Sequence, residues 1–465
     1  MKGEMQDDHV VRRDDVPITP HVGVFFRHLF LWVALILIQC VMFTPPLLAM
    51  DLMEAYTRAK SHDPAFGASQ YEHLAAMTLP LQGRSVLLPE VSASGSYASY
   101  DFGTAPEAYL DYTSRTSAIS LRQPLFNLSR FYEYRQYGIR GNMGEEKFIS
   151  AQQDLILRVA EAYFNALAAS DMLRLIDSEK TAVVEQREQA QKMYQAGVGT
   201  VTDVHEAQAR YETVLSKEVE AQNALDIRMQ VLKKIVGIDP GGLKVLQEDI
   251  PLSIPEPENL EGWIEKAQKH HPHLKSSAYQ VEYQQAELGK HRGQYWPSVD
   301  LVAGYNMTNS NNLIETKDTY YSSVGVRIEV PLFNGGYTWA KVKESKAVLG
   351  QAKKEYERML SDITEKLTEA FLGIRGSIAR THALAAAVRS ASTALHSNKK
   401  GLVAGIRTTT DVLNAQRELN DVRSRLLQAR YEYLMNIILL KSSAGILSES
   451  DLSAVNQWLQ NNEYE

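Results

Sequence analysis

Cysteine is almost absent from this sequence, since Cys40 is the single cysteine in 465 residues. A disulfide scaffold, a thiolate zinc site and a redox centre made of two cysteines are therefore excluded. An excess of basic charge is also missing, because the formal net charge is −7, and we expect no nucleic-acid partner. The mean hydropathy of −0.28 excludes a polytopic helical membrane protein. Composition alone thus predicts a large soluble protein, an expectation that the patterns along the chain then contradict.

Long apolar runs are missing too, with one exception of intermediate length. Residues 29–43 read LFLWVALILIQCVMF, a run of 15 uncharged residues that follows Arg27 and precedes the small Ala49. A membrane-spanning helix needs about 18 or more apolar residues, whereas a basic flank, an apolar core and a small residue are typical of a secretory signal peptide. We therefore predict a signal peptide with an N-terminal extension over 1–49. An uncleaved membrane anchor is the alternative.

The remainder of the chain is one unit written twice. Residues 59–64 (AKSHDP) match 267–272 (AQKHHP), and residues 196–200 (AGVGT) match 404–408 (AGIRT), an offset of 208 residues in both cases. Further matches at this offset, or within one residue of it, are Ala162-Tyr163-Phe164 with Ala370-Phe371-Leu372 and Pro124-Leu125-Phe126-Asn127 with Pro331-Leu332-Phe333-Asn334. Such a repeat indicates that each copy contributes the same set of structural elements.

Each copy contains two segments in which apolar and polar residues alternate. In the second copy Val299, Leu301, Ala303, Tyr305 and Met307 share one parity, and mostly polar residues share the other. Alternation with period two over about ten residues is typical of a strand with one apolar and one hydrated face. We predict strands at about 90–101 and 112–123 in the first copy and at about 298–309 and 319–330 in the second.

Proline is absent from two long stretches, 128–203 and 335–410, which are rich in the helix-forming residues Ala, Glu, Gln, Lys and Leu. A helix of about 65 residues would be about 100 Å long, because each residue adds about 1.5 Å. Since glycine-containing turns lie at 196–202 and 404–410, we predict very long helical hairpins over 128–236 and 336–445.

Four amphipathic strands in one chain cannot close a barrel, and open sheet edges do not occur in lipid. Bacterial outer-membrane barrels have at least about eight strands, so the chain must oligomerise if its strands lie in a membrane. The predicted fold class is therefore mainly α with a membrane β-barrel. Its building block is a duplicated unit of a strand pair followed by a very long helical hairpin.

The duplication, the two Pro-Leu-Phe-Asn segments, Ala162-Tyr163-Phe164-Asn165 and the two turns resemble the TolC-type outer-membrane channel-tunnel family of efflux pumps and type I secretion systems. The resemblance covers about residues 51–460. It implies a homotrimer in the cell outer membrane, with a twelve-stranded barrel continued by an α-helical barrel that extends into the periplasm. It also implies that there is no catalytic centre and no cofactor, so we do not expect an enzyme.

On this basis the chain after the signal peptide divides into a first repeat over 50–257, a second repeat over 258–447 and a C-terminal helix over 448–465. The end of the first repeat, 238–257, contains four prolines: Pro240, Pro251, Pro255 and Pro257. The resemblance implies that this segment and the C-terminal helix form an equatorial belt around the helical part.

The function implied by the resemblance is a passive exit duct for drug efflux, for type I protein secretion or for both, gated at its periplasmic tip. The implied partners are further copies of this chain, outer-membrane lipid, a periplasmic adaptor (membrane fusion protein) and an inner-membrane transporter of the RND or ABC type. The alternative, motivated by the hairpins alone, is a soluble periplasmic coiled-coil scaffold or adaptor. The alternating strands count against it, because a scaffold has no use for an apolar strand face.

The second turn contains the residues that the resemblance assigns to a constriction ring. Asp411 matches a position where the family has an acidic residue, and Asn414 occupies the family's second acidic position. The ring of a trimer would therefore carry three negative charges rather than six. The alternative interpretation is that Asp411 is a helix N-cap, as Asp203 would be in the first copy.

Arg407 matches a family residue that links to a Thr and an Asp of a neighbouring hairpin and keeps the tunnel closed. The matching partners here are Thr202 and Asp203, whereas Leu402 stands where the family has a Tyr. Because an exposed Arg–Asp pair contributes only about 0–1 kcal/mol, such a gate needs several links acting together. The alternative interpretation is that Arg407 is a solvated charge.

The resemblance also implies that the adaptor docks on the two turns. The residues concerned are Gly197, Val198, Gly199, Gly405 and Ile406. The glycines have a second explanation, because tight reversals of the chain require positive φ angles.

Other chemistry has little support in the sequence. His270, His271 and His273 suggest a metal site, but they flank Pro272 at the expected start of a helix. We found no Walker A sequence, no His-Glu-x-x-His and no nucleophile elbow. We therefore expect neither a metal site nor catalytic residues.

Overall fold

The computed structural model describes residues 49–101, 112–247, 249–312, 315–316 and 318–460. The chain divides into two units, Met1–Ala49 and Met50–Glu465. The signal peptide predicted over 1–49, with Cys40, lies outside the described residues except for Ala49. The second unit contains all the elements described below.

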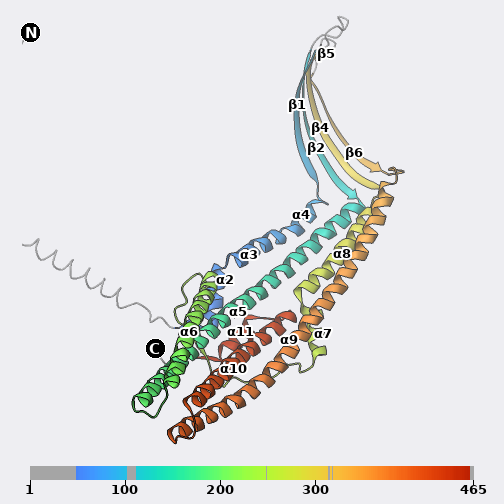
Figure 1. Ribbon diagram of the computed structural model, residues 1–465. Helices are drawn as coiled ribbons and strands as arrows, with labels where there is room; N and C mark the ends of the chain where they lie inside the picture. The colour runs from blue at the N-terminus through green and yellow to red at the C-terminus, as the bar shows by residue number, and fades with distance from the viewer. Residues whose placement is uncertain (1–48, 102–111, 248, 313–314, 317, 461–465) are drawn as a thin grey trace, which may run out of the picture. The chain divides into compact units, whose positions relative to one another are not determined.

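Two long helical hairpins dominate this unit (Figure 1). The first consists of α5 (Leu128–Gln195) and α6 (Val201–Val236), and the second of α9 (Tyr337–Val403) and α10 (Thr409–Ser443). With 68 and 67 residues, α5 and α9 are each about 100 Å long. Because no proline occurs within them, nothing in the backbone interrupts their hydrogen-bond ladders. Both predicted hairpins are thus present, with their turns inside the predicted ranges.

Shorter helices pack on α5 and α9. They are α2 (Leu52–His62), α3 (Pro64–Met77), α4 (Leu79–Ser85), α7 (Leu260–His270), α8 (Pro272–Gly293) and α11 (Glu449–Asn456). Pro64 and Pro272 are the first residues of α3 and α8, where a missing N–H is harmless. Both α8 and α10 contact α5 and α9, and the end of α10 meets the start of α8, since Gly445 lies against His271. The two helices therefore occupy successive stretches between α5 and α9 (Figure 1).

The strand pairs of the two copies form one antiparallel sheet. Its order is β1 (Glu90–Tyr100), β2 (Tyr112–Phe126), β4 (Ser298–Asn312) and β6 (Thr319–Glu329), and the two-residue β5 (Glu315–Thr316) pairs with the end of β4. Side chains of one parity, among them Val91, Ile119, Val324, Val326 and Ile328, form an exposed apolar face. The sheet thus has the two unlike faces that the alternation predicts.

The strand ends differ from the predicted ones by one to three residues, and the largest differences are in β2 and in β4, which continues to Asn312. The strand expected to end near residue 123 continues through Pro124 to Phe126, with a register shift that places Phe126 opposite Val299 of β4. By contrast, β6 ends at Glu329, before the second Pro-Leu-Phe-Asn segment. The reason is position in the sheet, because β2 has a strand on each side whereas β6 pairs only with β4 among the described strands. A register shift accommodates the proline that cannot donate to the ladder.

The hydrophobic core lies around the middle of α5 and α9 and does not extend to the hairpin turns. Its largest fully buried side chains include Trp263, Tyr163, Tyr433 and Phe164. Nearer their turns the hairpins contain only small clusters, such as Leu395, Val412 and Leu419 in the second. Their ends are therefore held by few apolar contacts, and turn geometry and polar links decide how they are arranged.

The C-terminal segment is only partly helical. The helix predicted over 448–465 is α11, which ends at Asn456, and the chain then forms β7 (Leu459–Gln460). This strand pairs with β3 (Val245–Leu246) of the segment 238–257. Pairing with β3 requires extended backbone, which explains why the helix stops. In the described part of the chain, no helix is both long and apolar enough to cross a membrane.

Candidate functional site

The two hairpin turns have the same construction. In the first, Gly197 has a φ of 73° and the N–H of Val198 donates to the carbonyl of Met193 at 3.0 Å. In the second, Gly405 has a φ of 74° and the N–H of Ile406 donates to the carbonyl of Gly401 at 2.9 Å. A left-handed residue after the last helical turn favours glycine strongly. Gly197 and Gly405 thus have a local structural reason, whereas the expectation was wrong for Gly199, which has no positive φ.

Of the five residues assigned to docking, Gly199 is half-buried and the other four are exposed. Val198 is 72% exposed and Ile406 is 79% exposed. A Cβ added to Gly197 or Gly405 would meet no atom within 4 Å. Each turn therefore presents an apolar side chain on a surface with room for a partner.

Both returning helices begin with a capping box. Thr408 is the N-cap of α10, and Asp411 Oδ2 accepts from the Thr408 N–H and from Thr408 Oγ1, both at 2.9 Å. Thr200 and Asp203 repeat this arrangement at the start of α6. The interpretation of the two aspartates as N-caps is thus wrong in detail, because the threonines are the caps and the aspartates stand three residues later.

The capping box also sets the charge of the second turn. Hydrogen bonds from the Thr408 backbone and hydroxyl, together with the nearby Arg407, hold the pKa of Asp411 below its usual 3.8. Asp411 is therefore ionised at neutral pH. Asn414, three residues further along α10, is exposed and lies on the same side of the helix.

The structure does not bring the assigned gate residues together within one chain. Arg407 packs against Gly401, where an added Cβ would come within 2.6 Å of its Cγ. In the described chain no hydrogen bond or ion pair joins Arg407 to Thr202 or Asp203. The assigned link is thus not made within this chain.

A different polar link joins the two hairpins near their turns. Thr410 Oγ1 of α10 donates to Glu206 Oε2 of α6 at 2.5 Å. Sequence reasoning missed this pair, because 204 residues separate its members and neither belongs to a recognisable motif. The one available signal was weak: Glu206 follows Asp203 by three residues and so lies on the same side of α6.

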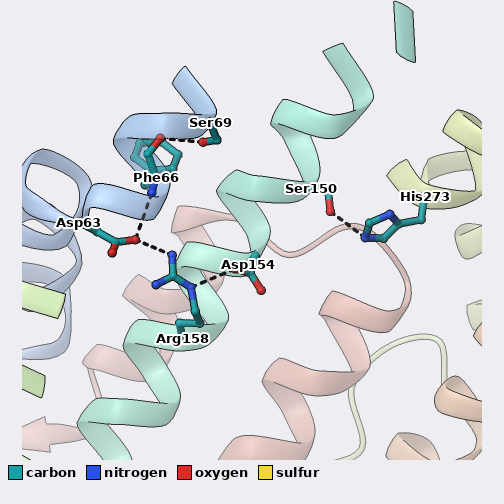
Figure 2. A network of polar contacts seen from close by, with 7 residues as sticks. All are labelled: Asp63, Phe66, Ser69, Ser150, Asp154, Arg158 and His273. Carbon is teal, nitrogen blue, oxygen red and sulfur yellow. Dashed lines mark hydrogen bonds and ion pairs between the residues drawn. The ribbon is translucent and has the colours of Figure 1, made fainter. Parts of the chain in front are cut away.

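A second polar cluster lies where α3 begins against α5 (Figure 2). Asp63 accepts from the Phe66 N–H at 3.2 Å and from Arg158 Nη2 at 2.5 Å. Arg158 also donates through Nε to Asp154 at 2.9 Å. The Asp63 carboxylate therefore caps α3 and, through Arg158, connects it to α5.

The second copy replaces that pair with other residues. At the 208-residue offset Asp63 becomes His271 and Arg158 becomes Lys366. The His271 side chain makes no capping hydrogen bond to α8, is only 9% exposed and leaves its Nδ1 without a partner. His273 instead contacts Ser150 Oγ through Nε2 at 2.9 Å (Figure 2).

A metal site at these histidines, the rival hypothesis, gains no support. Beside them lies a hollow of about 790 Å³ whose lining includes Asp154, Asp362 and Lys366. Within the described ranges, no three His, Cys, Asp or Glu side chains are grouped so that they could hold a metal ion. The hollow has mixed charge and marks the joint between α8 and α10.

We expect His271 to make the protein sensitive to mild acid. Burial, together with the positive charges of His273 and Lys366, lowers the pKa of His271 from 6.5 to about 4. Between pH 6.5 and about 4, His271 is protonated in the unfolded chain but stays neutral in the folded protein. The free energy of unfolding therefore decreases as the pH is lowered through this window, by a total on the order of 3 kcal/mol. Thermal unfolding of His271→Asn should show a shallower pH dependence in this window. A slope equal to that of the wild type would contradict this prediction, and His396→Asn, an exposed change on α9, is the control.

Comparison with known proteins places these features in a family. A family model described as "Outer membrane efflux protein" matches residues 55–238 and 263–445, one stretch in each copy. Outer membrane protein TolC of Vibrio cholerae is 31% identical over 416 residues, which cover 89% of this chain and 94% of that protein. Alkaline protease secretion protein AprF of Pseudomonas aeruginosa is 31% identical, with 88% of this chain and 87% of that protein covered.

The fold has solved counterparts as well. The outer membrane protein VceC of Vibrio cholerae superimposes with a TM-score of 0.74 at 17% identity, over 85% of this chain and 96% of that one. At this level of identity the likeness concerns the fold alone. It confirms the predicted fold class of strand pairs combined with very long helical hairpins.

Proposed function

Because the chain belongs to the outer membrane efflux protein family, we propose that three copies form a passive exit duct through the outer membrane. The family is one of channels rather than enzymes, and its location is the outer membrane with an extension into the periplasm, in agreement with the prediction from the sequence. The observation that carries the proposal is the sheet, whose apolar face is exposed and whose edge strands β1 and β6 are each paired on one side only among the described strands.

The open edges support assembly. Unpaired N–H and C=O groups at a sheet edge are not tolerated in lipid, so β6 of one chain would pair with β1 of the next. Three chains with four strands each would close a barrel of twelve strands, within the range known for outer-membrane barrels. The apolar side chains would then face lipid and the polar ones the pore.

We also propose the division into repeats over 50–257 and 258–447 with a C-terminal segment over 448–465. The two stretches matched by the family model fall within the two repeats. The pairing of β3 with β7 joins the segment 238–257 to the C-terminal segment. This supports a belt made of both.

The hairpin turns are the proposed docking surface for a periplasmic adaptor and, through it, for an inner-membrane transporter. The exposed Val198 and Ile406 support this assignment, because an apolar side chain at the end of each hairpin offers a surface to bury. One relative, AprF, is named for the secretion of an alkaline protease. We propose that this chain serves type I protein secretion, drug efflux or both.

Fractionation separates the duct from the alternative, a soluble periplasmic scaffold. The duct predicts that the protein is found in the outer-membrane fraction, is extracted only by detergent and runs as a trimer in light scattering. Purified trimer added to a planar bilayer should produce discrete conductance steps. Protein that is soluble without detergent and makes no conductance would favour the scaffold.

We propose that Arg407 helps to hold the turns closed through Thr202 and Asp203 of a neighbouring chain. An exposed pair is worth about 0–1 kcal/mol, so three copies would change the ratio of open to closed channels by at most about a hundredfold. Single-channel recording of Arg407→Ser should show a higher conductance in the resting state. The control is Lys400→Ser, which removes a charge from the last turn of α9. Resting currents that are the same in both variants would reject the gate role.

We propose that Asp411 forms a ring of three negative charges at the periplasmic entrance. Asp411→Asn removes the charge while its amide oxygen still accepts from Thr408, so the turn should be preserved. Block of the single-channel current by a trivalent cation should weaken by about tenfold or more. The reason is that three Asp411 carboxylates around one axis would all attract the same cation. The control Asp421→Asn, further along α10, should leave the block unchanged. Equal block in wild type and Asp411→Asn would remove Asp411 from the constriction.

A further inference from the structure

The polar face of the four-stranded sheet carries its charge at one level only. Five charged residues lie there, at the strand ends next to the helices, and we call them the basal belt: Glu90 of β1, Arg122 of β2, Asp300 of β4, and Arg327 and Glu329 of β6. The register places Glu90 opposite Arg122, Asp300 opposite Arg327, and Glu329 opposite Ser298. All five therefore share one face and a short stretch of the strands.

The rest of this face is uncharged. Its other residues are small, polar, aromatic or, at Val302, aliphatic: Ser92, Ser94 and Ser96 on β1, Ser120, Ala118 and Thr116 on β2, Val302, Gly304, Asn306 and Thr308 on β4, and Gly325, Ser323 and Tyr321 on β6. The other charged residue of these strands, Arg115, has the opposite parity and lies over the ring of Tyr97, 5.5 Å from its centre. Within these four strands, as far as the structure describes them, fixed charge on the polar face is thus confined to the end next to the helices.

One ion pair organises the belt. Arg122 donates to Asp300 Oδ2 through Nε at 3.0 Å and through Nη2 at 2.6 Å, across the junction between the strands of the two copies. Asp300 is only 2% exposed, and its other oxygen has no hydrogen-bond partner. Glu90, Arg327 and Glu329 are exposed. A buried carboxylate held by an arginine therefore sits among charges that project from the face.

The consequence rests on the proposed function, in which the polar face lines the pore. The belt has two arginines and three carboxylates, so its net charge is −1 per chain and −3 in a trimer. In a pore with low-dielectric walls, a few fixed charges change the local concentration of ions. We propose that the basal belt is a charge filter in the wall of the pore, separate from the hairpin turns, which favours cations over anions.

Arg122 is the residue whose charge affects the filter most clearly. It offsets the charge of Asp300, and replacing it with a neutral residue would change the net charge of the belt from −1 to −2 per chain. Neutralising Glu329, which is exposed on an edge strand, would change it to 0. The two substitutions should thus shift ion preference in opposite directions.

The test is the reversal potential of purified trimers in a planar bilayer under a KCl gradient with about 0.1 M salt on the dilute side. Arg122→Gln should raise the permeability ratio of K⁺ to Cl⁻ by about twofold or more. Arg115→Gln is the matched control, because it removes the same charge from the same strand on the opposite face, and it should change nothing. The double variant Arg122→Gln/Asp300→Asn should return to the wild-type ratio. In about 1 M salt the difference should fade, because charges are then screened within about 3 Å.

Two outcomes overturn the inference. One is an equal permeability ratio in Arg122→Gln, Arg115→Gln and wild type, which means that the belt does not act on passing ions. If Arg122→Gln fails to assemble, Glu329→Gln decides the question: a lowered K⁺ to Cl⁻ ratio supports the filter and an unchanged ratio rejects it. A wild-type protein that makes no pore at all would instead overturn the proposed function itself, which separates the two failures.

Discussion

Replacing Gly445 with alanine is expected to lower the free energy of unfolding by about 3 kcal/mol or more. Gly445 has a φ of 71°, where an L-residue costs about 1–2 kcal/mol. In addition, a Cβ at this position would lie 2.4 Å from His271 Cα and 3.0 Å from Pro272 Cδ. These atoms belong to the backbone and ring at the start of α8 and cannot rotate away. The substitution should therefore force α10 and α8 apart at their joint.

Gly405→Ala provides the matched control for this effect. Gly405 has nearly the same φ, 74°, but nothing lies within 4 Å of its added Cβ. Its replacement should cost only the backbone term of about 1–2 kcal/mol. Gly237→Ala should fall between the two, because its Cβ would meet the movable ring of His62. Thermal unfolding of the detergent-solubilised trimers measures all three. Equal decreases in stability for Gly445→Ala and Gly405→Ala would contradict the prediction, because they would show that α8 and α10 move apart at little energetic cost.

Arg158→Met is expected to destabilise the protein by about 3–5 kcal/mol, because it leaves the buried Asp63 carboxylate without its charged partner. The Asp63 side chain is 7% exposed, and it loses the bond that fastens α3 to α5. Asp154→Asn is the control, because Asp154 bonds to the same arginine but is 59% exposed. An exposed pair of this kind is worth about 0–1 kcal/mol. A loss below about 1 kcal/mol for Arg158→Met would contradict the prediction.

The same pair predicts a loss of stability in strong acid. Burial alone would raise the pKa of Asp63, but the hydrogen bond and charge of Arg158, with the Phe66 N–H, outweigh it and hold the pKa below 3.8. A lowered folded-state pKa contributes stability above pH 3.8, which is lost as the pH falls through the folded value. Arg158→Met should show a smaller loss below pH 3.8 than the wild type. A steeper loss in the variant would show that Arg158 does not stabilise the ionised form.

Local patterns predicted the hairpins and their turns well. Proline-free stretches and the glycines at 197 and 405 act over a few residues, so the sequence contains the whole interaction. The end of β2 was not predictable in this way. Whether a strand ends at Pro124 depends on whether a neighbouring strand pairs with the residues around it. That neighbouring strand, β4, belongs to the other copy.

The candidate site shows the same division. The capping boxes of Asp203 and Asp411 involve residues three positions apart, and the turn glycines have their reason in their own φ angles. The Thr410–Glu206 link and the Arg122–Asp300 pair join residues 204 and 178 positions apart. No local pattern indicates such partners, since a side chain finds them only after the helices and strands have packed.

The sequence by itself determined the repeated unit, the parity of its strands and the length and turns of its hairpins, because these depend on contacts between near neighbours in the chain. The tertiary structure decided how the two copies differ in use. It placed Asp63 against Arg158 and left His271 buried without a cap, and it brought the charges of four strands to one level of one face. Equal positions in the repeat thus acquire unequal roles, because burial and register depend on the neighbours that the fold supplies.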